Sequence, residues 1–479
     1  MRWHSLLYSL WTRFCEQAFI IPDSMLPLMS SNVPPISDVI IFFMRRKIIN
    51  GLWLVAFLPF VVWGLYYLPP IHSRVAWRLD NFRTWMAYRI NPPDEAIFQP
   101  GGETALTIET VIATTRAEYA LTLTPQVTPT PNFGPTPRPT ITTTPLPATV
   151  RLEGVKYEDQ HNRWNYCGPA NFSMSLTFWG WDGNRDIVGK AVKPSDKDRN
   201  VMPYEFQDFI AENVQGMSSL MRYGGDIEVV KRLVSAGFPV VAEKGYYERD
   251  FTGKVGWMGH YQFITGYDER TRQVLVQDTY NDGPNFQISF DEFMNGWRSF
   301  NYLFVVVYPT DREQDVMLLL GNLADADSAA RHALEIARRE SQSLSGIDRY
   351  FAWFNAGTSH VALKEYVDAA SFYDQAFAVY ANLGGDNTTR PYRMMWYQTG
   401  PYWAYYYSGR YADVINLANT TLKDTISEPV LEESLLWRGR ALYMAGDTPG
   451  AIKDYRAALK VHPKWEPAVQ ALQDLGMQP

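Results

Sequence analysis

Residues 160–172 read QHNRWNYCGPANF, and the thiol of Cys167 is the feature from which the rest of the chain can be interpreted. Gly168 and Pro169 predict a turn into a helix, because proline is favoured in the first helical turn, where its missing N–H is not needed. At a helix N-terminus the helix dipole and free N–H groups stabilise a thiolate, which is the nucleophilic form of cysteine. A small buried hydrophobic residue is the alternative, since that is what a free cysteine most often is.

A base and a carboxylate for this thiol lie about a hundred residues further on. His260 falls in a strand-like run, 259–266, which a polar turn separates from a second run, Val274–Asp278. If the two runs form a hairpin, His260 and Asp278 are nearly equidistant from the turn and face each other on neighbouring strands. Asp278 could then orient the imidazole, and the imidazole could take the proton of Cys167.

Gln160 precedes the cysteine by seven residues. Its side-chain N–H could join the backbone N–H of Cys167 in holding an oxyanion, although a solvated turn residue is the alternative interpretation. The seven histidines of the chain show no metal-ligand spacing, and no EF-hand loop is present. We therefore expect neither a metal nor a cofactor.

Composition limits the remaining possibilities. The chain has 479 residues, which predicts two or three domains. Cys15 is the only other cysteine, so a disulfide scaffold and a four-cysteine metal site are excluded. The formal net charge of -7 argues against a nucleic-acid partner, because such proteins usually carry a basic face.

The N-terminal region predicts a membrane anchor. Residues 48–68 are uncharged and about long enough to cross a bilayer as a helix, with basic residues before them and aromatic residues near their far end. Residues 121–149 contain ten threonines and eight prolines, which favour an extended stalk over a packed core. We expect a single-pass membrane protein whose C-terminal domains are extracytoplasmic. The predicted layout is an N-terminal segment (1–47), a transmembrane helix (48–69), a juxtamembrane segment and stalk (70–149), a globular domain (150–310) and a helical domain (311–479).

The globular domain has helical patterns first and strand-like runs later, which suggests the α+β class. Helices are predicted directly after Cys167, at Met202–Asn213 and at Ile227–Ala236; strands are predicted at Pro239–Glu243, His260–Tyr267, Val274–Asp278 and Tyr302–Tyr308. Asp226 is expected to cap the third helix. The glycine- and aromatic-rich stretch 245–259 is expected to be either a mobile rim of the active-site cleft or an ordinary exposed loop.

The last 130 residues or so resemble a tetratricopeptide (TPR) array. The stretch Tyr350–Ala381 has Trp353, Gly357, Ala369, Tyr373 and Ala376 at the expected intervals, and Glu432–Pro463 has Gly439, Gly446, Ala451, Tyr455, Ala458 and Pro463. A third copy, near Met395–Lys423, is weaker and follows an apparent insertion at Leu383–Arg393. Small residues are expected where paired helices touch, and a helix at Asp327–Ser341 is expected to pack as a leading cap.

Together these motifs resemble the C-thirty-nine-like (C39-like) peptidases, which are papain-like cysteine peptidases related to the leader peptidases of bacteriocin exporters. The resemblance covers residues 150–309 and adds Phe290–Trp297 and a closing hydrophobic strand to the motifs above. It implies that Cys167 is the nucleophile, His260 the general base, Asp278 its partner and Gln160 the oxyanion donor. In the exporter enzymes the glutamine stands one residue closer to the cysteine. The chain also lacks a phosphate-binding glycine-rich loop, so an exporter ATPase is not implied.

The resulting hypothesis is a membrane-anchored thiol hydrolase that cleaves a peptide or amide bond, with a protein partner bound in the groove of the repeats. Two alternatives remain open at this point. The protein could be a non-catalytic assembly factor, or it could transfer the acyl group to an acceptor amine in place of water.

Overall fold

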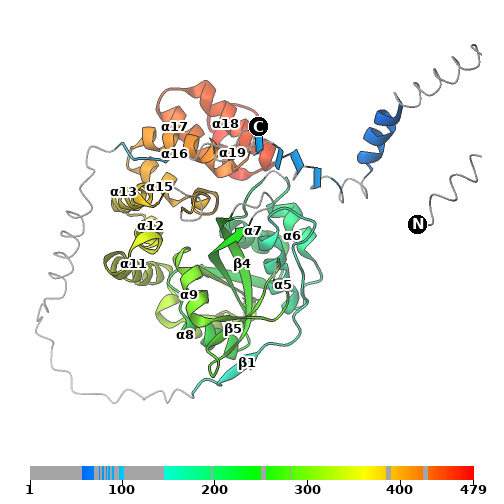
Figure 1. The fold of residues 1–479 in the computed structure, drawn as a ribbon, viewed down its shortest axis with the longest axis vertical. Helices are drawn as coiled ribbons and strands as arrows, with labels where there is room; N and C mark the ends of the chain where they lie inside the picture. Colours follow the sequence, from blue (N-terminus) through cyan, green and yellow to red (C-terminus); the bar gives the residue numbers. More distant parts are fainter. Residues whose placement is uncertain are drawn as a thin grey trace, which may run out of the picture. The chain divides into compact units, whose positions relative to one another are not determined.

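An antiparallel seven-stranded sheet lies at the centre of residues 149–309 (Figure 1). The computed structural model describes residues 57–68, 97–101 and 145–479, with gaps at 196–197, 250–254, 281, 385–389, 424 and 426–429, and single residues between 75 and 90. The strand order is β2-β7-β3-β4-β5-β6, and β1 pairs with β4. The strands are β1 (Thr149–Arg151), β2 (Met217–Arg222), β3 (Val240–Arg249), β4 (Val255–Asp268), β5 (Gln273–Gln277), β6 (Phe286–Ser289) and β7 (Phe304–Pro309).

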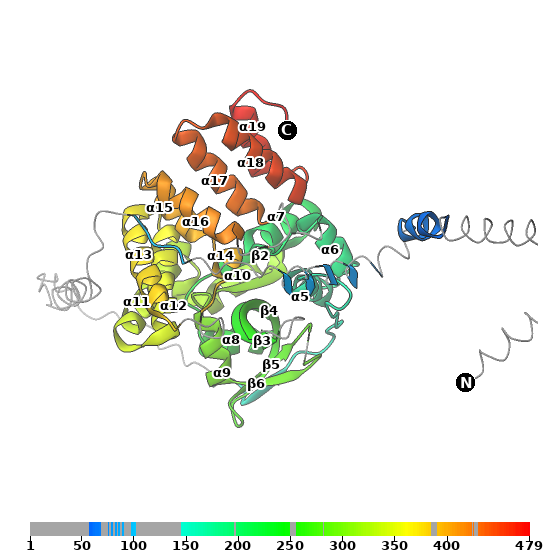
Figure 2. The same cartoon turned by 45° about the horizontal axis from the view of Figure 1, so that its top comes forward.

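Helices cover both faces of the sheet (Figure 2). They are α5 (Cys167–Phe178), α6 (Arg185–Val192), α7 (Pro203–Asn213), α8 (Ile227–Ser235) and α9 (Phe290–Arg298). Alternate residues of a strand point to opposite faces. Val241 and Phe263 therefore pack with α5 and α7, whereas Val240 and Ile264 pack with α8 and α9. Because both faces are buried, the central strands are nearly continuous apolar runs, which is why the sequence reveals them.

The sequence-based strands and helices agree with this structure in position, with ends that shift by a few residues. Asp226 caps α8 as expected, since its carboxylate accepts a hydrogen bond from the backbone N–H of Val229. The short elements β1, β2, β6, α6 and α9 were not predicted. In β2 the cause is its composition, MSSLMR, whose polar residues hide the strand pattern.

The interpretation of residues 245–259 as a rim or loop was wrong. β3 and β4 pair with each other over residues 245–249 and 255–259, where Gly245 lies opposite Gly259, and residues 250–254 lie outside the described residues. Trp257, which the sequence suggested would lie in a loop, is only 2% exposed. The glycines allow the close approach of bulky side chains here, so their abundance does not indicate mobility.

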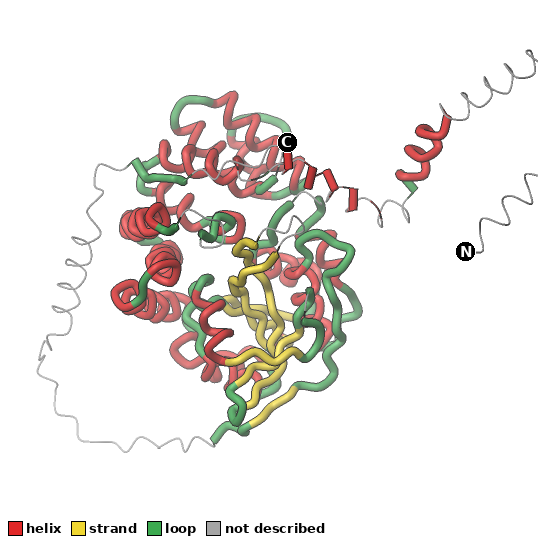
Figure 3. Tube along the Cα trace, viewed as in Figure 1, coloured by secondary structure: helices red, strands yellow, loops and turns green. Residues whose placement is uncertain are grey.

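Helices follow the sheet to the C-terminus (Figure 3). They are α10 (Glu313–Leu320), α11 (Ala326–Ser343), α12 (Gly346–Ala362), α13 (Tyr366–Asn382), α14 (Met394–Tyr397), α15 (Gly400–Tyr407), α16 (Tyr411–Lys423), α17 (Glu432–Met444), α18 (Thr448–Val461) and α19 (Glu466–Asp474). Neighbours in sequence pack as pairs, among them α12 with α13 and α17 with α18. A Cβ atom on Gly357 would lie 2.8 Å from the ring of Tyr373, and one on Gly439 would lie 2.5 Å from the ring of Tyr455. Small residues thus stand where paired helices touch, as expected.

The sheet and the helices that follow it share one hydrophobic core. The Trp257 ring stacks on Phe300 at 5.7 Å and also lies against Phe351 of α12 and Tyr397 of α14, with centroid distances of 5.9 and 5.8 Å. The side chain of Arg298 adds ion pairs to Glu340 and Asp348. The helical part is therefore packed directly against the half of β4 that leads to His260.

Residues 97–101, in the predicted juxtamembrane segment, also pack on the helices. The Phe98 ring meets Phe377 of α13 edge-on at 4.9 Å, and the backbone N–H of Gly101 donates to the Asp413 carboxylate at 2.8 Å. Residues 97–101, which precede the predicted stalk at 121–149, are therefore packed against the helical part. The threonine- and proline-rich stretch lies, up to residue 144, outside the described residues.

The predicted membrane span is described only over residues 57–68, of which 57–66 are helical. Among the described residues, no helix has both the length and the apolar character that crossing a bilayer requires.

Candidate active site

Cys167 is the first residue of α5, as the sequence predicted. Two hydrogen bonds of 2.8 Å run from the Asn171 amide to the backbone oxygens of Cys167 and Tyr261, and so tie the start of this helix to β4. A Cβ atom on Gly168 would lie 2.9 Å from Phe206 of α7, so the residue after the cysteine has little room to be anything but glycine. The thiol is thus held at a fixed point against the strand that carries His260.

His260 lies on β4 and is 4% exposed. Its Nε2 atom is 3.0 Å from Oδ2 of Asp278, so Nε2 carries the proton in this contact. The imidazole also interacts with the thiol of Cys167. Burial lowers the pKa of His260, but the bonds to these two groups outweigh burial and raise the pKa to about 9.

Asp278 follows β5 directly, and its carboxylate accepts several hydrogen bonds. The donors are His260, the Gln262 amide at 2.9 Å, the backbone N–H of Tyr280 at 2.8 Å and, at 3.5 Å, the backbone N–H of Asp282. Burial raises the pKa of Asp278, but the bond and charge of His260 and the other donors hold that pKa well below its usual range. The carboxylate is therefore charged at neutral pH, where it favours the imidazolium.

The pKa of the Cys167 thiol is lowered, whereas that of His260 is raised. Burial raises the pKa of Cys167, whereas the hydrogen bond and charge of His260 and the backbone N–H of Gly168 lower it, with a net decrease. A lowered thiol pKa beside a raised imidazole pKa is the electrostatic signature of a thiolate–imidazolium pair. Such a pair combines an attacking sulfur with a proton that is ready for a leaving group.

Gln160 contacts Thr279, the residue that follows Asp278. Its amide oxygen accepts the Thr279 hydroxyl at 2.9 Å, and its backbone N–H donates to the Thr279 backbone oxygen at 2.8 Å. With the oxygen engaged in this way, the amide NH2 group is turned away from Thr279 and remains able to donate to a ligand. The structure thus brings Cys167, His260 and Asp278 together. Gln160 is held by its two hydrogen bonds to Thr279, the residue that follows Asp278.

Sequence reasoning missed a buried carboxyl group next to the thiol. Glu243 is 2% exposed on β3, directly across from Tyr261. Burial and the nearby charge of Cys167 raise the pKa of Glu243 well above its usual range. Its Oε1 atom has no hydrogen-bond partner among the described residues. The available signal was a lone acidic residue inside the apolar run 238–243.

Sequence reasoning also missed the contribution of the helical part. The Tyr397 ring of α14 lies against Gly259, the residue before His260. Burial and the charge of Cys167 raise the pKa of the Tyr397 hydroxyl. The Tyr246 ring packs edge-on against the His260 imidazole at 5.4 Å. Tertiary packing, which no local pattern reveals, therefore forms part of the wall around the thiol.

Replacing Gly259 by Ala is expected to destabilise the protein by about 1–3 kcal/mol, because overpacking a filled site has that cost. The new Cβ would lie 2.7 Å from Phe300 and 2.9 Å from Tyr397. Gly256→Ala on the same strand is the matched control, since its Cβ would make an ordinary 3.4 Å contact with Tyr392. Thermal unfolding should show a clearly lower midpoint for the first variant, and equal midpoints would contradict the packing described here.

With this geometry in place, comparison with known proteins is informative. Residues 152–305 match the family model described as the Peptidase_C39 like family. The chain contains a C39-like domain. A crystal structure from Bacillus anthracis, provisionally described as a C39-like peptidase, is similar at 15% identity over 33% of this chain and 97% of that chain, with a TM-score of 0.28. No curated protein matches the chain. The match to the C39-like domain ends before the helical part begins.

Proposed function

We propose that the C39-like domain is a thiol hydrolase that cleaves a peptide or amide bond through Cys167, His260 and Asp278, with Gln160 as an oxyanion donor. The observation that carries the proposal is the Asp278–His260 contact of 3.0 Å beside a thiol whose pKa is lowered. A merely structural cysteine would not need a buried, charge-stabilised imidazole next to it.

The proposed reaction has two steps. The Cys167 thiolate attacks the carbonyl carbon, and the backbone N–H of Cys167 and the Gln160 amide hold the resulting oxyanion. His260 gives its proton to the leaving amine, so the C–N bond breaks and a thioester remains. His260 then takes a proton from water, which attacks the thioester and releases the acid and the thiolate. Asp278 keeps the imidazole oriented and stabilises its charged form.

The rest of the chain would bring the substrate to the thiol and anchor the protein in a membrane. We propose that the paired helices after residue 311 are TPR-like repeats that bind a protein partner or a substrate segment, which would raise the local substrate concentration at the thiol. We further propose that residues 48–69 anchor the chain in a membrane with the folded domains on the extracytoplasmic side. The uncharged run and the stalk composition support this location.

A peptide-library digestion tests the hydrolase proposal. The full-length chain is incubated with a proteome-derived peptide library, with and without an added amine, and new termini are identified by mass spectrometry. We expect new termini that are absent with Cys167→Ala; free carboxylates indicate hydrolysis, and amine-capped termini indicate acyl transfer. Identical products from the two proteins would contradict catalysis and favour a non-catalytic binding module.

A further inference from the structure

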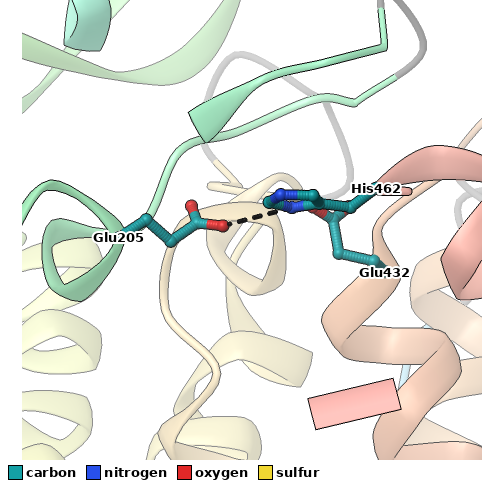
Figure 4. A group of neighbouring side chains, drawn as sticks. All are labelled: Glu205, Glu432 and His462. Atoms are coloured by element: carbon teal, nitrogen blue, oxygen red, sulfur yellow. Dashed lines mark ion pairs between the residues drawn. The ribbon is translucent and has the colours of Figure 1, made fainter. Parts of the chain in front are cut away.

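A buried group of two carboxylates and an imidazole joins the C39-like domain to the helical part (Figure 4). Glu205 comes from α7, Glu432 from the first turn of α17, and His462 from the residue after α18. Glu205 is 6% exposed and Glu432 is 1% exposed. Glu205 is more than two hundred positions from Glu432 and His462 in the sequence, so only the packing of the two parts brings it to them.

The distances within this group are too long for ordinary hydrogen bonds between opposite charges. Nδ1 of His462 is 3.5 Å from Oε1 of Glu205 and 3.4 Å from Oε1 of Glu432, whereas a charge-assisted N–H···O bond is about 2.7–2.9 Å long. Among the described residues, His462 Nδ1, Glu205 Oε1 and Glu432 Oε2 have no hydrogen-bond partner. Three buried polar atoms that form no hydrogen bond, and only long ion-pair contacts, call for a ligand that the protein does not itself supply.

The same distances fit a shared metal ion. Zinc binds imidazole nitrogen and carboxylate oxygen at about 2.0–2.2 Å in tetrahedral geometry, which places neighbouring ligand atoms about 3.3–3.6 Å apart. The ligand atoms of the three residues all lie within 4.8 Å of one another. The remaining oxygen of Glu205, Oε2, accepts the backbone N–H of Met202 at 2.7 Å. That bond fixes the carboxylate with Oε1 toward His462, in the manner of an outer-shell bond that orients a ligand.

Charge balance points the same way. Two buried glutamates share a single histidine, so even a protonated imidazole leaves one carboxylate without a counter-charge inside the group, which is costly to bury unless a cation offsets it. A further carboxylate, Asp198, is 2% exposed and lies within electrostatic range of Glu205 and Glu432. Its Oδ2 atom has no hydrogen-bond partner among the described residues. Asp198 therefore adds to the acidic character around the group, and the charge of Lys193 also acts on it.

We propose that Glu205, Glu432 and His462 bind a divalent transition-metal ion of the zinc type, and that this ion fastens the helical part to the C39-like domain. The nitrogen and oxygen donors suit such a metal better than Mg²⁺ or Ca²⁺, which prefer oxygen alone. The site is separate from Cys167, and the proposal does not depend on the proposed peptidase activity. It does bear on the thiol, because Phe206 follows Glu205 on α7 and packs against Gly168.

A second group with the same residue types shows the contrast. His360, Glu365 and Asp368 also lie close together, but Nδ1 of His360 already has Oε2 of Glu365 at 2.7 Å. His360 and Glu365 therefore form a hydrogen-bonded pair. Glu365 is partly exposed and Asp368 is exposed. This group supplies the matched control for the metal site.

Equilibrium dialysis with Zn²⁺ alone tests the proposal. The full-length chain is used in a Cys167→Ser background so that the thiol and His260 do not contribute. We expect one bound equivalent, an at least 100-fold weaker affinity for Glu432→Gln and His462→Gln, and no change for His360→Gln. Absence of binding in the parent protein, or equal binding in the parent and both ligand variants, would overturn the proposal.

A gain-of-signal variant guards against misfolding of the ligand variants. In His462→Cys, a thiolate replaces the imidazole, and Co²⁺ bound there should show a sulfur-to-cobalt charge-transfer band that the parent with Co²⁺ lacks. A folded His462→Cys protein, judged by circular dichroism, that shows no such band would contradict the assignment of this residue as a ligand. Thermal unfolding adds a readout of function, since Zn²⁺ should raise the midpoint of the parent but not of Glu432→Gln.

Discussion

His260→Ala should lower the rate of Cys167 alkylation by iodoacetamide at pH 6.5 by about tenfold or more. Without the imidazole the thiol returns to a pKa of about 8.5 or above, so only about 1% of it is thiolate at that pH. The loss of thiolate is thus up to roughly 100-fold, the limit for a wild-type thiol that is fully ionised at this pH. It is offset in part because a thiolate of higher pKa is intrinsically more nucleophilic, by up to about a factor of ten here.

His161→Ala is the matched control for this experiment. His161 is the other histidine of the domain, is 52% exposed and pairs with Asp159 on the surface. Its removal should leave the alkylation rate of Cys167 unchanged. If His260→Ala and His161→Ala react at the same rate as the wild type, then His260 does not activate the thiol, and the role proposed for it is wrong.

Asp278→Ala should destabilise the C39-like domain by about 3–5 kcal/mol, which is the usual cost of removing one partner of a buried ion pair. The substitution leaves His260, the Gln262 amide and the Tyr280 N–H without their acceptor in a buried site. For a domain of this size the melting temperature should fall by roughly 10 °C.

The pH dependence separates the Asp278 effect from a simple packing loss. The folded-state pKa of Asp278 is depressed, so its contribution to stability is present above the unfolded-state value of about 3.9 and is lost as the pH falls through the folded value. The wild type and Asp278→Ala should therefore converge in stability in strong acid. Asp159→Ala is the control: that carboxylate is 41% exposed and pairs with Arg185 at the surface, so its loss should cost about 0–1 kcal/mol. Equal losses for the two variants would contradict the buried role of Asp278.

Local sequence signals were sufficient to locate most of the active-site residues. The Gly168-Pro169 pair predicts the helix start at Cys167, and the two apolar runs predict the strands that carry His260 and precede Asp278. The register was less accurate. A bulge between Ile264 and Gly266 shifts the pairing so that Phe263 lies across from Gln277. Asp278 consequently binds both Gln262 and His260. The predicted contact between His260 and Asp278 is therefore present, although the two residues are not directly opposite each other in the sheet.

What the sequence could not reveal depends on tertiary packing. Glu243 reaches the thiol from a neighbouring strand, and Tyr397 reaches it from a helix more than a hundred residues away. Likewise, no spacing rule connects Glu205 with Glu432 and His462, because each lies on a different element and the elements meet only in the folded chain. The expectation that no metal is bound followed from spacing alone and would be revised by the proposed site.

Ultraviolet titration of the Cys167 thiolate tests the central claim most directly, namely that His260 holds this thiol in its reactive form. The thiolate absorbance of the full-length chain is followed from pH 4 to pH 10, and the titration of Cys167→Ala is subtracted to remove the tyrosines and Cys15. The account predicts a midpoint well below 8.5 that rises in His260→Ala. A midpoint at or above 8.5 in both proteins would contradict it.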